Sequence, residues 1–318
     1  MATVHATPEN IARGARIIRS GGLVAFPTET VYGLGANALD AKAVARIFEV
    51  KQRPSFDPLI VHVSGQEMLG RVVAQVPEQA TRLMEKFWPG PLTLVMPKSP
   101  AIPGIVTSGL ETVAVRMPNH PAALELLRRA LVPIAAPSAN PFGYLSPTRA
   151  EHVERMLGDL VDLILDDGAT RFGVESTILL IGDPPVVLRF GAVAVEELEE
   201  QVGPVAVSLG ENATPLAPGQ LLRHYSPRTR IVIAHLEDVP LEKRTGAGFL
   251  AFRRAPEGFK RAVVLSGSGD LKEAAAGLFE ALHQLDQEGL EAIYAEPVPE
   301  VGLGRAIMDR LRRASAGR

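Results

Sequence analysis

Apolar residues are spaced in two different ways along the first two thirds of the chain. Short unbroken apolar runs predict strands, and apolar residues spaced three to four positions apart predict helices. The expected strands are 22–27, 59–63, 92–96, 112–116, 132–136, 163–165, 176–181 and 186–189. The expected helices are 9–20, 41–50, 77–87, 120–130, 148–157 and 195–202. This alternation predicts an α/β domain, with a sheet covered on at least one face because its apolar runs do not alternate with polar residues.

The pattern weakens after residue 207. Residues 208–229 carry three prolines and two glycines and show no periodicity, which is typical of a linker or a functional loop. Beyond them we expect strands at 230–234, 248–252, 262–265 and 291–294 and helices at 270–287 and 303–313. The chain is therefore expected to hold a first domain at 1–207, a linker or lid at 208–229 and a smaller α/β domain at 230–318.

Composition narrows the possible chemistry. The chain has 318 residues and no cysteine, which excludes disulfides and thiolate catalysis and leaves only histidine and carboxylates for a zinc site. Its net charge of −3 does not favour bulk nucleic-acid binding. No apolar run approaches the ~20 residues that a membrane helix needs, and the first residues lack the pattern of a signal peptide, so a cytoplasmic protein is expected. The sequence also lacks G-x-x-x-x-G-K-[ST], G-x-G-x-x-G, H-E-x-x-H and G-x-S-x-G motifs.

One cationic loop follows the expected helix at 41–50. Lys51 and Arg53 enter a loop whose backbone is restricted by Pro54 and Pro58. A rigid loop with two cations suits an anionic ligand such as a phosphate. For Lys51 alone, an equally good interpretation is that it complements the dipole of the helix C-terminus. His62 lies inside the next expected strand, where a histidine is more often a core residue than a ligand contact.

Small polar side chains gather at the ends of several other expected strands. Thr112 and Arg116 lie on the same face of the strand at 112–116, because side chains alternate with a period of two. The apolar neighbours of Arg116 favour a buried guanidinium that binds a carboxylate or phosphate over an exposed edge charge. Ser138, Asn140 and Ser146 follow the strand at 132–136, in a segment that is either an ordinary turn-rich loop or the rim of a ligand site.

Five segments occur in the order and approximate spacing of the YrdC-like family, and on them the chain is similar to that family: FPTETVYGLG, KQRPSFDPLIVHV, VAVRMPNHP, PSANPFG and GVESTI. The later PGQLLRHYSP and GLGRAIMDRLRRAS resemble the long, two-domain type of L-threonylcarbamoyladenylate synthase. The resemblance implies an open twisted mixed sheet with helices and a smaller, Rossmann-like C-terminal α/β domain. It also implies a nucleotidyltransferase that converts L-threonine, bicarbonate and ATP, with Mg2+, into threonylcarbamoyl-AMP and pyrophosphate. The product would pass to a separate tRNA threonylcarbamoyl transferase complex.

The resemblance also assigns roles to individual residues. Threonine is expected to contact Thr30, His62, Arg116, Ala136 and Ser176. ATP is expected to contact Lys51, Arg53, Asp57, Thr112, Ser138, Asn140, Ser146, Arg189, His224 and Tyr225. Lys51 and Arg53 would be the catalytic cations, no metal-ligating protein residue is expected, and relatives often carry Asn where this chain has Asp57. His224 and Tyr225 would fold over the cleft as a lid, whereas Gly33 and Gly35 would let the backbone turn behind Thr30.

Two other functions remain open at this point. YrdC-like domains also resemble double-stranded RNA binders, so a non-catalytic, translation-associated module is the alternative, although the net charge counts against it. A carbamoyl-adenylate former of the hydrogenase-maturation kind would carry zinc-finger-like regions, which a chain without cysteine cannot build. Pyrophosphate release that depends on threonine and bicarbonate would separate the synthase from the RNA-binding module.

Overall fold

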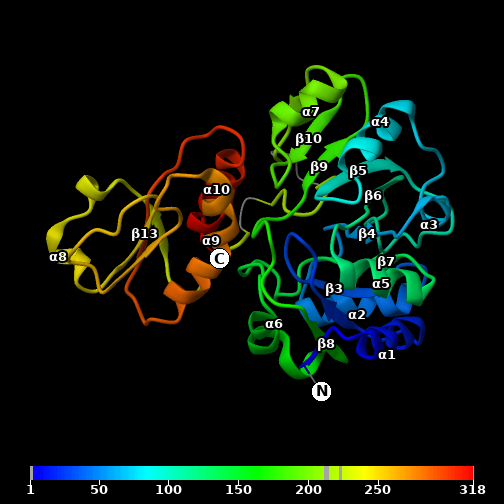
Figure 1. The fold of residues 1–318 in the computed structure, drawn as a ribbon, viewed down its shortest axis with the longest axis horizontal. Coiled ribbons are helices and arrows are strands. Elements are labelled where there is room, and N and C mark those ends of the chain that lie inside the picture. Colours follow the sequence, from blue (N-terminus) through cyan, green and yellow to red (C-terminus); the bar gives the residue numbers. More distant parts are fainter. Residues whose placement is uncertain (1–2, 211–214, 222–223, 318) are drawn as a thin grey trace.

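The computed structural model describes residues 3–210, 215–221 and 224–317, and it contains a large and a small sheet, each with its own helices (Figure 1). In the described residues the large sheet has eleven strands in the order β1-β8-β2-β3-β7-β4-β6-β5-β9-β10-β11. These strands are β1 (Thr3–His5), β2 (Val24–Phe26), β3 (Gly33–Asn37), β4 (Ile60–His62), β5 (Leu92–Pro97), β6 (Thr112–Arg116), β7 (Ile134–Ala135), β8 (Leu163–Asp166), β9 (Thr177–Leu180), β10 (Val186–Arg189) and β11 (Ala206–Val207). The sheet is mixed: β4 pairs with β6 in parallel, for example, and with β7 in antiparallel fashion.

The helices that cover this sheet arise largely where the sequence pattern predicts them. They are α1 (Pro8–Arg19), α2 (Ala41–Lys51), α3 (Gln66–Leu69), α4 (Glu78–Phe87), α5 (Pro121–Ala130), α6 (Ala150–Leu157), the 3-10 turn η1 (Gly158–Leu160) and α7 (Val195–Val202). Thr7 and Asp40 cap the first turns of α1 and α2 by accepting hydrogen bonds from backbone amides. No helix among the described residues is both long and apolar enough to cross a bilayer.

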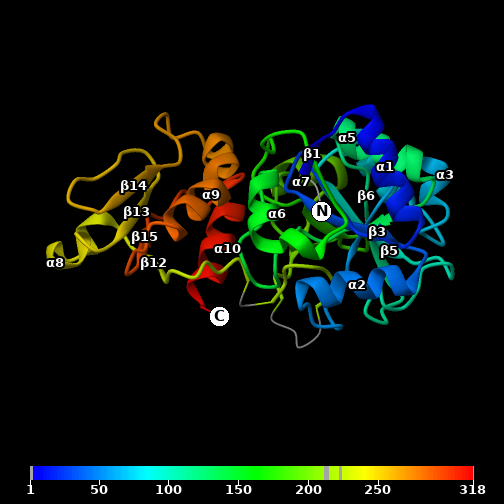
Figure 2. The same cartoon turned by 90° about the horizontal axis from the view of Figure 1, so that it is seen from below.

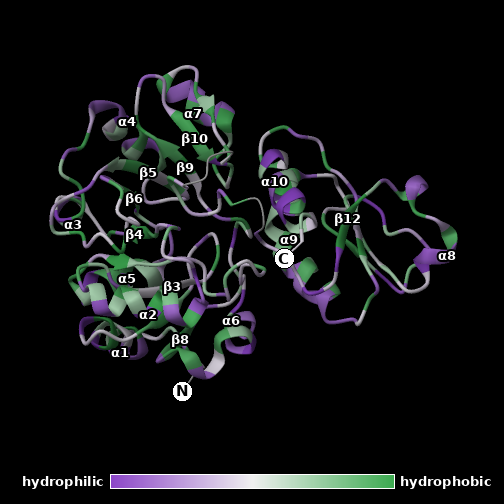
Figure 3. Ribbon diagram, turned by 180° about the vertical axis from the view of Figure 1, so that it is seen from behind, coloured by the Kyte–Doolittle hydropathy of each residue, from purple (hydrophilic) through white to green (hydrophobic). Residues whose placement is uncertain are grey.

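The second sheet has four parallel strands in the order β12-β15-β13-β14. Its elements are β12 (Ile231–Ile233), the 3-10 turn η2 (Leu236–Asp238), α8 (Leu241–Arg244), β13 (Gly248–Ala251), β14 (Arg261–Val264), α9 (Leu271–Asp286), β15 (Ile293–Ala295) and α10 (Gly304–Ser315). Figures 1 and 2 show α9 and α10 lying between this sheet and the first domain. Figure 3 shows hydrophobic colour on the interior strands β9 and β10 and hydrophilic colour on α8, which has no buried residue.

The prediction of a mixed α/β fold with a smaller second α/β domain is confirmed. The last strand of the large sheet is β11 and the first of the small sheet is β12, and the described residues between them form neither helix nor strand. The pattern missed β1 and β11, which are short edge strands, and the short helices α3 and α8. It also missed β3, because the sequence GLGAN contains only one large apolar residue.

Gly33 and Gly35 belong to β3, so the expectation that they form a turn was wrong. They pair with Phe26 and Val24 of β2 in antiparallel register. What Gly35 provides is space rather than a turn, because a methyl group placed on it would lie 2.7 Å from Cε1 of Phe26 and 2.8 Å from Cγ2 of Ile134. The absence of a side chain at this position therefore lets the large sheet carry bulky neighbours directly over β3.

We expect Gly35→Ala to lower the free energy of unfolding by about 1–3 kcal/mol, because overpacking of a well-filled core forces its neighbours to move. Gly33→Ala is the matched control in the same strand. A methyl group there would lie 3.4 Å from Cβ of Ala136 and 3.5 Å from Cζ of Phe26, which is close to ordinary contact. Urea unfolding of the two variants tests this, and equal midpoints for both would contradict the packing argument.

The two domains share a continuous apolar interface. One buried cluster joins Val31, Leu145 and Val174 of the first domain to residues of α9 and α10. Gly173 makes the approach possible: it has a φ of 66°, and a methyl group on it would lie 2.2 Å from the carbonyl oxygen of Ala276 in α9. Polar contacts surround this cluster, including the ion pair between Arg149 and Glu280 at 3.0 Å. The second domain is therefore packed firmly onto the first.

Two stacked histidines lie in this interface, one from each domain. The rings of His152 and His283 are 3.9 Å apart at an interplanar angle of 25°, and Nε2 of His283 hydrogen-bonds the carbonyl oxygen of Ser146 at 3.1 Å. Burial lowers the pKa of His283 from 6.5 to about 4, and burial together with the neighbouring His283 lowers the pKa of His152. Both rings are therefore neutral at neutral pH, although Glu280 lies 3.6 Å from Nε2 of His152.

This pair makes the free energy of unfolding sensitive to acid. Between pH 6.5 and about 4 the unfolded chain binds a proton at His283 that the folded chain does not, so stability falls as the pH is lowered through this window. We expect His283→Gln, whose amide can still donate to Ser146, to reduce the slope by up to about 1.4 kcal/mol per pH unit. Urea unfolding at pH 7 and pH 5 measures it. Parallel pH profiles for wild type and variant would refute this.

Candidate active site

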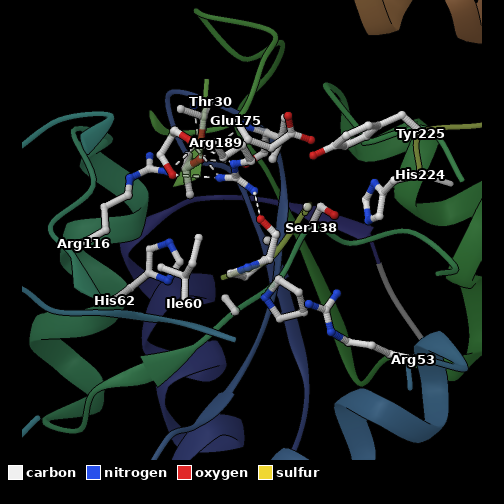
Figure 4. Close-up of a pocket in the computed structure, with 18 residues that line it drawn as sticks. Thr30, Arg53, Ile60, His62, Arg116, Ser138, Glu175, Arg189, His224 and Tyr225 are labelled. Atoms are coloured by element: carbon white, nitrogen blue, oxygen red, sulfur yellow. Dashed lines mark hydrogen bonds between the residues drawn. The ribbon is translucent and has the colours of Figure 1, made fainter. Parts of the chain in front are cut away.

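A pocket lies where strand ends of the large sheet meet the segment between the domains. Its lining residues are Thr28, Thr30, Val31, Gly33, Arg53, Ile60, His62, Arg116, Ala136, Pro137, Ser138, Glu175, Ser176, Arg189, Pro218, Gly219, His224 and Tyr225. Figure 4 shows that one end of this pocket holds Thr30, His62 and Arg116. The opposite end holds Arg53, His224 and Tyr225, and Glu175 and Arg189 lie between the two ends (Figure 4).

The fold brings these residues together by ending several strands at one place. β4 and β6 are parallel neighbours in which His62 is paired with Arg116, so both side chains leave the sheet at the same level. Thr30 comes from the loop between β2 and β3, and Ser176 immediately precedes β9. Arg189 is the last residue of β10. Strand ends with small polar groups therefore form the walls of one site, as the sequence pattern predicts.

Arg116 is buried and already partly engaged. One guanidinium nitrogen donates to Oγ1 of Thr30 at 2.9 Å, and another lies 2.7 Å from a carboxylate oxygen of Glu29. Thr30 is itself held by Thr28, whose hydroxyl lies 2.8 Å away. Nε of Arg116 makes no hydrogen bond to any described residue. The guanidinium is thus fixed in orientation, and its buried Nε is a donor without a partner among the described residues.

His62 lies beside Arg116 and is 4% exposed. Burial and the neighbouring guanidinium lower its pKa from 6.5 to about 3, so the ring is neutral at neutral pH. Its edge meets the ring of Phe26, with centroids 6.1 Å apart. The ring lines the pocket, and its Nδ1 has no hydrogen-bond partner among the described residues, which goes beyond a purely structural core position.

Lys51 does not line the pocket, although its side chain lies directly beneath the loop that does. Its Nζ donates to the carbonyl oxygen of Ser138 at 2.6 Å and to that of Asn140. The side chain is only 1% exposed, and burial, followed by the nearby Arg53, lowers its pKa well below the ordinary value. The structure therefore places Lys51 as a support for the loop after β7.

Arg53 lines the pocket and is held on its other side by its own loop. It donates to the carbonyl oxygens of Asp57 at 3.0 Å and Pro58 at 2.8 Å, and its guanidinium lies 2.9 Å from the Asp57 carboxylate. Burial raises the pKa of Asp57, whereas Arg53 opposes that rise. Asp57 contacts the Arg53 guanidinium but does not line the pocket, so its role is to orient Arg53.

Glu175 is a charged pocket residue that sequence reasoning missed, along with Thr28, Val31, Gly33, Ile60, Pro137, Pro218 and Gly219. Its carboxylate accepts a hydrogen bond from Ser146 at 2.5 Å and from Nε of Arg310 in α10 at 2.9 Å. Burial alone would raise the pKa of Glu175, but Arg310 and Arg189 lower it overall, so the group is ionised. Glu175 stands within the segment GVESTI, and a charged residue at a buried strand end was the available signal.

Ser176 and Arg189 form a second fixed unit on the wall. Arg189 donates from Nε to the carbonyl oxygen of Ser176 at 3.1 Å and from a terminal nitrogen to its hydroxyl at 3.1 Å. The same hydroxyl lies 2.7 Å from Oγ1 of Thr93. The hydroxyl of Ser176 is therefore held by two partners, and the positive charge of Arg189 stays close to the middle of the pocket.

The segment between the domains closes the remaining side. His224 and Tyr225 lie on the pocket together with Pro218 and Gly219. Tyr225 is 1% exposed and adopts a φ of 62°, which is uncommon for a bulky residue. Its hydroxyl makes no hydrogen bond within the described part of the chain, and Figure 4 shows it directed toward the pocket. Burial keeps both groups neutral, since it raises the pKa of Tyr225 and lowers that of His224.

The structure thus brings ten of the predicted residues to one pocket: Thr30, Arg53, His62, Arg116, Ala136, Ser138, Ser176, Arg189, His224 and Tyr225. Five others do not line it: Lys51, Asp57, Thr112, Asn140 and Ser146. Four of these five support the walls through the contacts of their side chains, and Thr112 lies half-buried at the start of β6. Among the residues that the structure describes, no three histidines and carboxylates gather in a way that could hold a metal ion.

Two family models match the chain. The Sua5-YciO-YrdC model, described as telomere recombination, matches residues 16–191. A second model, described as threonylcarbamoyl-AMP synthase, C-terminal domain, matches residues 193–316. The boundary between the two matches lies close to the start of α7.

Full-length relatives and a solved structure agree with these matches. The threonylcarbamoyl-AMP synthase of Pyrococcus abyssi is 46% identical over 96% of this chain and 93% of its own length, and that of Bacillus subtilis is 43% identical over 97% and 93%. A crystal structure of Pyrococcus abyssi Sua5 complexed with L-threonine has a TM-score of 0.91 and 42% identity to this chain. That similarity covers 98% of this chain and 95% of the other.

Proposed function

Because the chain belongs to the Sua5-YciO-YrdC family, in the group of threonylcarbamoyl-AMP synthases with a second domain, we propose that it makes threonylcarbamoyl-AMP and pyrophosphate from L-threonine, bicarbonate and ATP. The observation that carries this proposal is the two-ended pocket, in which buried arginines face polar groups at either end. One end suits an amino acid, and the other suits a nucleotide phosphate.

The amino acid lies at the end formed by Thr30, His62 and Arg116 in this proposal. Arg116 binds the carboxylate, because a guanidinium matches the two oxygens of that group and Nε is still available as a donor. His62 and Thr30 contact the other polar groups of threonine, and Ala136 and Ser176 line the space between them. The relative whose crystal structure contains L-threonine supports this choice of amino acid.

The nucleotide lies toward Arg53, His224 and Tyr225. Arg53 and Arg189 supply the positive charge that a triphosphate requires, and Ser138 offers a hydroxyl between them. Lys51 acts indirectly: its Nζ donates hydrogen bonds to carbonyl oxygens of the loop that carries Ser138. This changes the role expected for Lys51 from direct contact with phosphate to support of the phosphate-binding loop.

The reaction then has two steps. The threonine amine attacks the carbon of bicarbonate or of CO2 derived from it, and an N–C bond forms. With CO2 the nitrogen releases one proton, whereas with bicarbonate a C–O bond breaks and that proton leaves with the hydroxide as water. The resulting carbamate oxygen attacks the α-phosphorus of ATP, and the bond to pyrophosphate breaks. Such a transfer depends on positioning and charge neutralisation more than on covalent help from protein.

We propose that Mg2+ enters with ATP rather than in a protein cage. Glu175 lines the pocket and Glu29 and Asp57 contact its arginines, and each of these three carboxylates is paired with an arginine. This donor set fits an ion carried by phosphate oxygens and water, which is the usual manner in which Mg2+ accompanies a nucleotide. When bound, the ion would neutralise charge on the departing pyrophosphate. The product would then be handed to a tRNA threonylcarbamoyl transferase complex.

The experiment that tests the function is an omission assay. Purified protein is incubated with ATP, Mg2+, threonine and bicarbonate, and pyrophosphate is measured after each component is left out in turn. We expect release to require all four and to be lost when threonine is replaced by valine, which lacks the hydroxyl group. Release that is unaffected by omission of threonine and bicarbonate would contradict the proposal, and no release at all would fit the non-catalytic RNA-binding alternative.

A further inference from the structure

Helix α10 of the second domain reaches the wall of the pocket through one buried arginine. Arg310 is fully buried, donates from Nε to the Glu175 carboxylate at 2.9 Å and from a terminal nitrogen to the carbonyl oxygen of Phe190 at 2.9 Å. Glu175 lines the pocket directly. The positive charge of Arg310, on the last helix of the chain, is therefore paired with Glu175, which lines the proposed substrate pocket.

The same arginine also contacts the segment that closes the pocket. The guanidinium carbon of Arg310 lies 4.8 Å from the centre of the Tyr225 ring, within the range of a cation–π contact. Glu175 on one side and Tyr225 on the other thus share one cation. Since Tyr225 holds an uncommon left-handed backbone conformation, a fixed partner over its ring helps to keep the ring on the pocket.

Arg313, one turn further along α10, holds the linker at two points. Its terminal nitrogens donate to the carbonyl oxygens of Leu221 at 2.6 Å and Leu209 at 2.8 Å. These two carbonyls lie at the two ends of the segment that contains Pro218 and Gly219 of the pocket wall. One guanidinium therefore bridges the base of this segment, which is a use of arginine that lysine cannot reproduce in full.

Asp309 orients both arginines. One carboxylate oxygen lies 2.6 Å from Arg310 and the other lies 2.9 Å from Nε of Arg313. All three side chains are buried, so an unpaired charge among them would be costly. Their mutual pairing, and the carbonyl oxygens that accept their remaining donors, make the group a rigid connection between α10 and the linker.

We propose that Asp309, Arg310 and Arg313 are positioning residues that hold the linker over the reacting groups, so that the second domain takes part in catalysis. This inference rests on the proposed function. Carbamates and carbamic–phosphoric anhydrides hydrolyse readily, and water that attacks the anhydride of the product returns AMP and a carbamate, which loses CO2. A linker that is held in place excludes that water, whereas a loosened linker admits it.

The test compares Arg313→Gln with Arg312→Gln in the full-length chain. Arg312 is the matched control, because it lies next to Arg313 on α10 but pairs with Glu300 at a half-exposed position. Two quantities are measured for each variant. The first is the yield of threonylcarbamoyl-AMP per pyrophosphate released, and the second is the rate of amide hydrogen exchange of residues 215–221. This yield does not depend on the fraction of active enzyme. We expect Arg313→Gln to lower the yield and kcat/KM for ATP by about tenfold, roughly the effect of a small misplacement.

Exchange of residues 215–221 should rise in Arg313→Gln and stay at the wild-type level in Arg312→Gln, and Arg313→Lys should recover part of the yield. Unchanged exchange, or a lower rate with an unchanged yield, would overturn the inference, because a merely structural role scales all products equally. Glu175→Gln/Arg310→Met provides a second variant that removes both charges of the Glu175–Arg310 pair and leaves Asp309 paired with Arg313, and it should lower the yield in the same manner. A wild-type chain without synthase activity would contradict the proposed function, whereas exchange alone decides whether Arg313 holds the linker.

Discussion

Replacing Arg116 with alanine is expected to weaken threonine binding and lower kcat/KM for threonine at least about 100-fold, while the affinity for ATP changes far less. Removal of one partner of a buried, hydrogen-bonded charge pair costs about 2–5 kcal/mol, and 100-fold corresponds to about 2.7 kcal/mol. Arg116 is 3% exposed, and Glu29 and Thr30 hold its guanidinium at the amino-acid end of the pocket. Calorimetry with each ligand separately measures the two affinities.

The variant also leaves the Glu29 carboxylate buried without its cation, which by itself could unfold the loop. Glu29→Gln/Arg116→Ala removes both charges and separates ligand binding from stability. Arg128→Ala, at an exposed position on α5, is the control for loss of an arginine elsewhere. An equal loss of threonine and ATP affinity in the double variant would show that Arg116 does not bind the amino-acid carboxylate.

Ending the chain after Val207 is expected to leave a folded first domain with at least about 100-fold lower synthase activity. The large sheet has an apolar cluster of its own, made of residues between Ile11 and Leu198, so its core does not require the second domain. The pocket, however, loses Pro218, Gly219, His224 and Tyr225, and Glu175 loses Arg310. Exclusion of water and correct placement of reacting groups commonly account for effects of this size.

Circular dichroism and urea unfolding establish whether the shortened chain is folded, and the pyrophosphate assay gives its activity. A chain that ends after residue 229 is the informative control. It retains the linker but lacks Arg310 and Arg313, so we expect its synthase activity to remain low although it carries His224 and Tyr225. Full activity in the chain that ends at Val207 would exclude an essential contribution of the linker.

The fold could be predicted well wherever the apolar pattern is strong. The runs that became β4, β5 and β6 are bulky and continuous, and both α/β domains follow from their alternation with helices. β3 could not be predicted in this way, because its glycines contribute space rather than apolar surface. Local sequence carries no signal for the space that Phe26 and Ile134 need across the sheet.

The site was predictable at strand ends and less so where its chemistry depends on distant partners. Arg116 was accessible from its position at the end of an apolar run, whereas the pattern favoured a core position for His62, and the site roles of His62 and Ser176 came from the family resemblance. Glu175 also stands at a strand end, but the local pattern does not reveal its partner Arg310, which lies 135 residues further along the chain. Lys51 shows the converse, since a cation before a proline-restricted loop suggests phosphate binding, and only the structure shows that two carbonyl oxygens already occupy its Nζ.

The most direct test of the account uses bicarbonate labelled with heavy carbon. Wild-type protein is incubated with ATP, Mg2+, threonine and the labelled bicarbonate, and the nucleotide products are separated rapidly and analysed by mass spectrometry. We predict an adenylate whose mass equals that of threonylcarbamoyl-AMP with the labelled carbon, formed in proportion to pyrophosphate. Pyrophosphate release without any labelled adenylate, under conditions where added threonylcarbamoyl-AMP survives, would contradict the central claim.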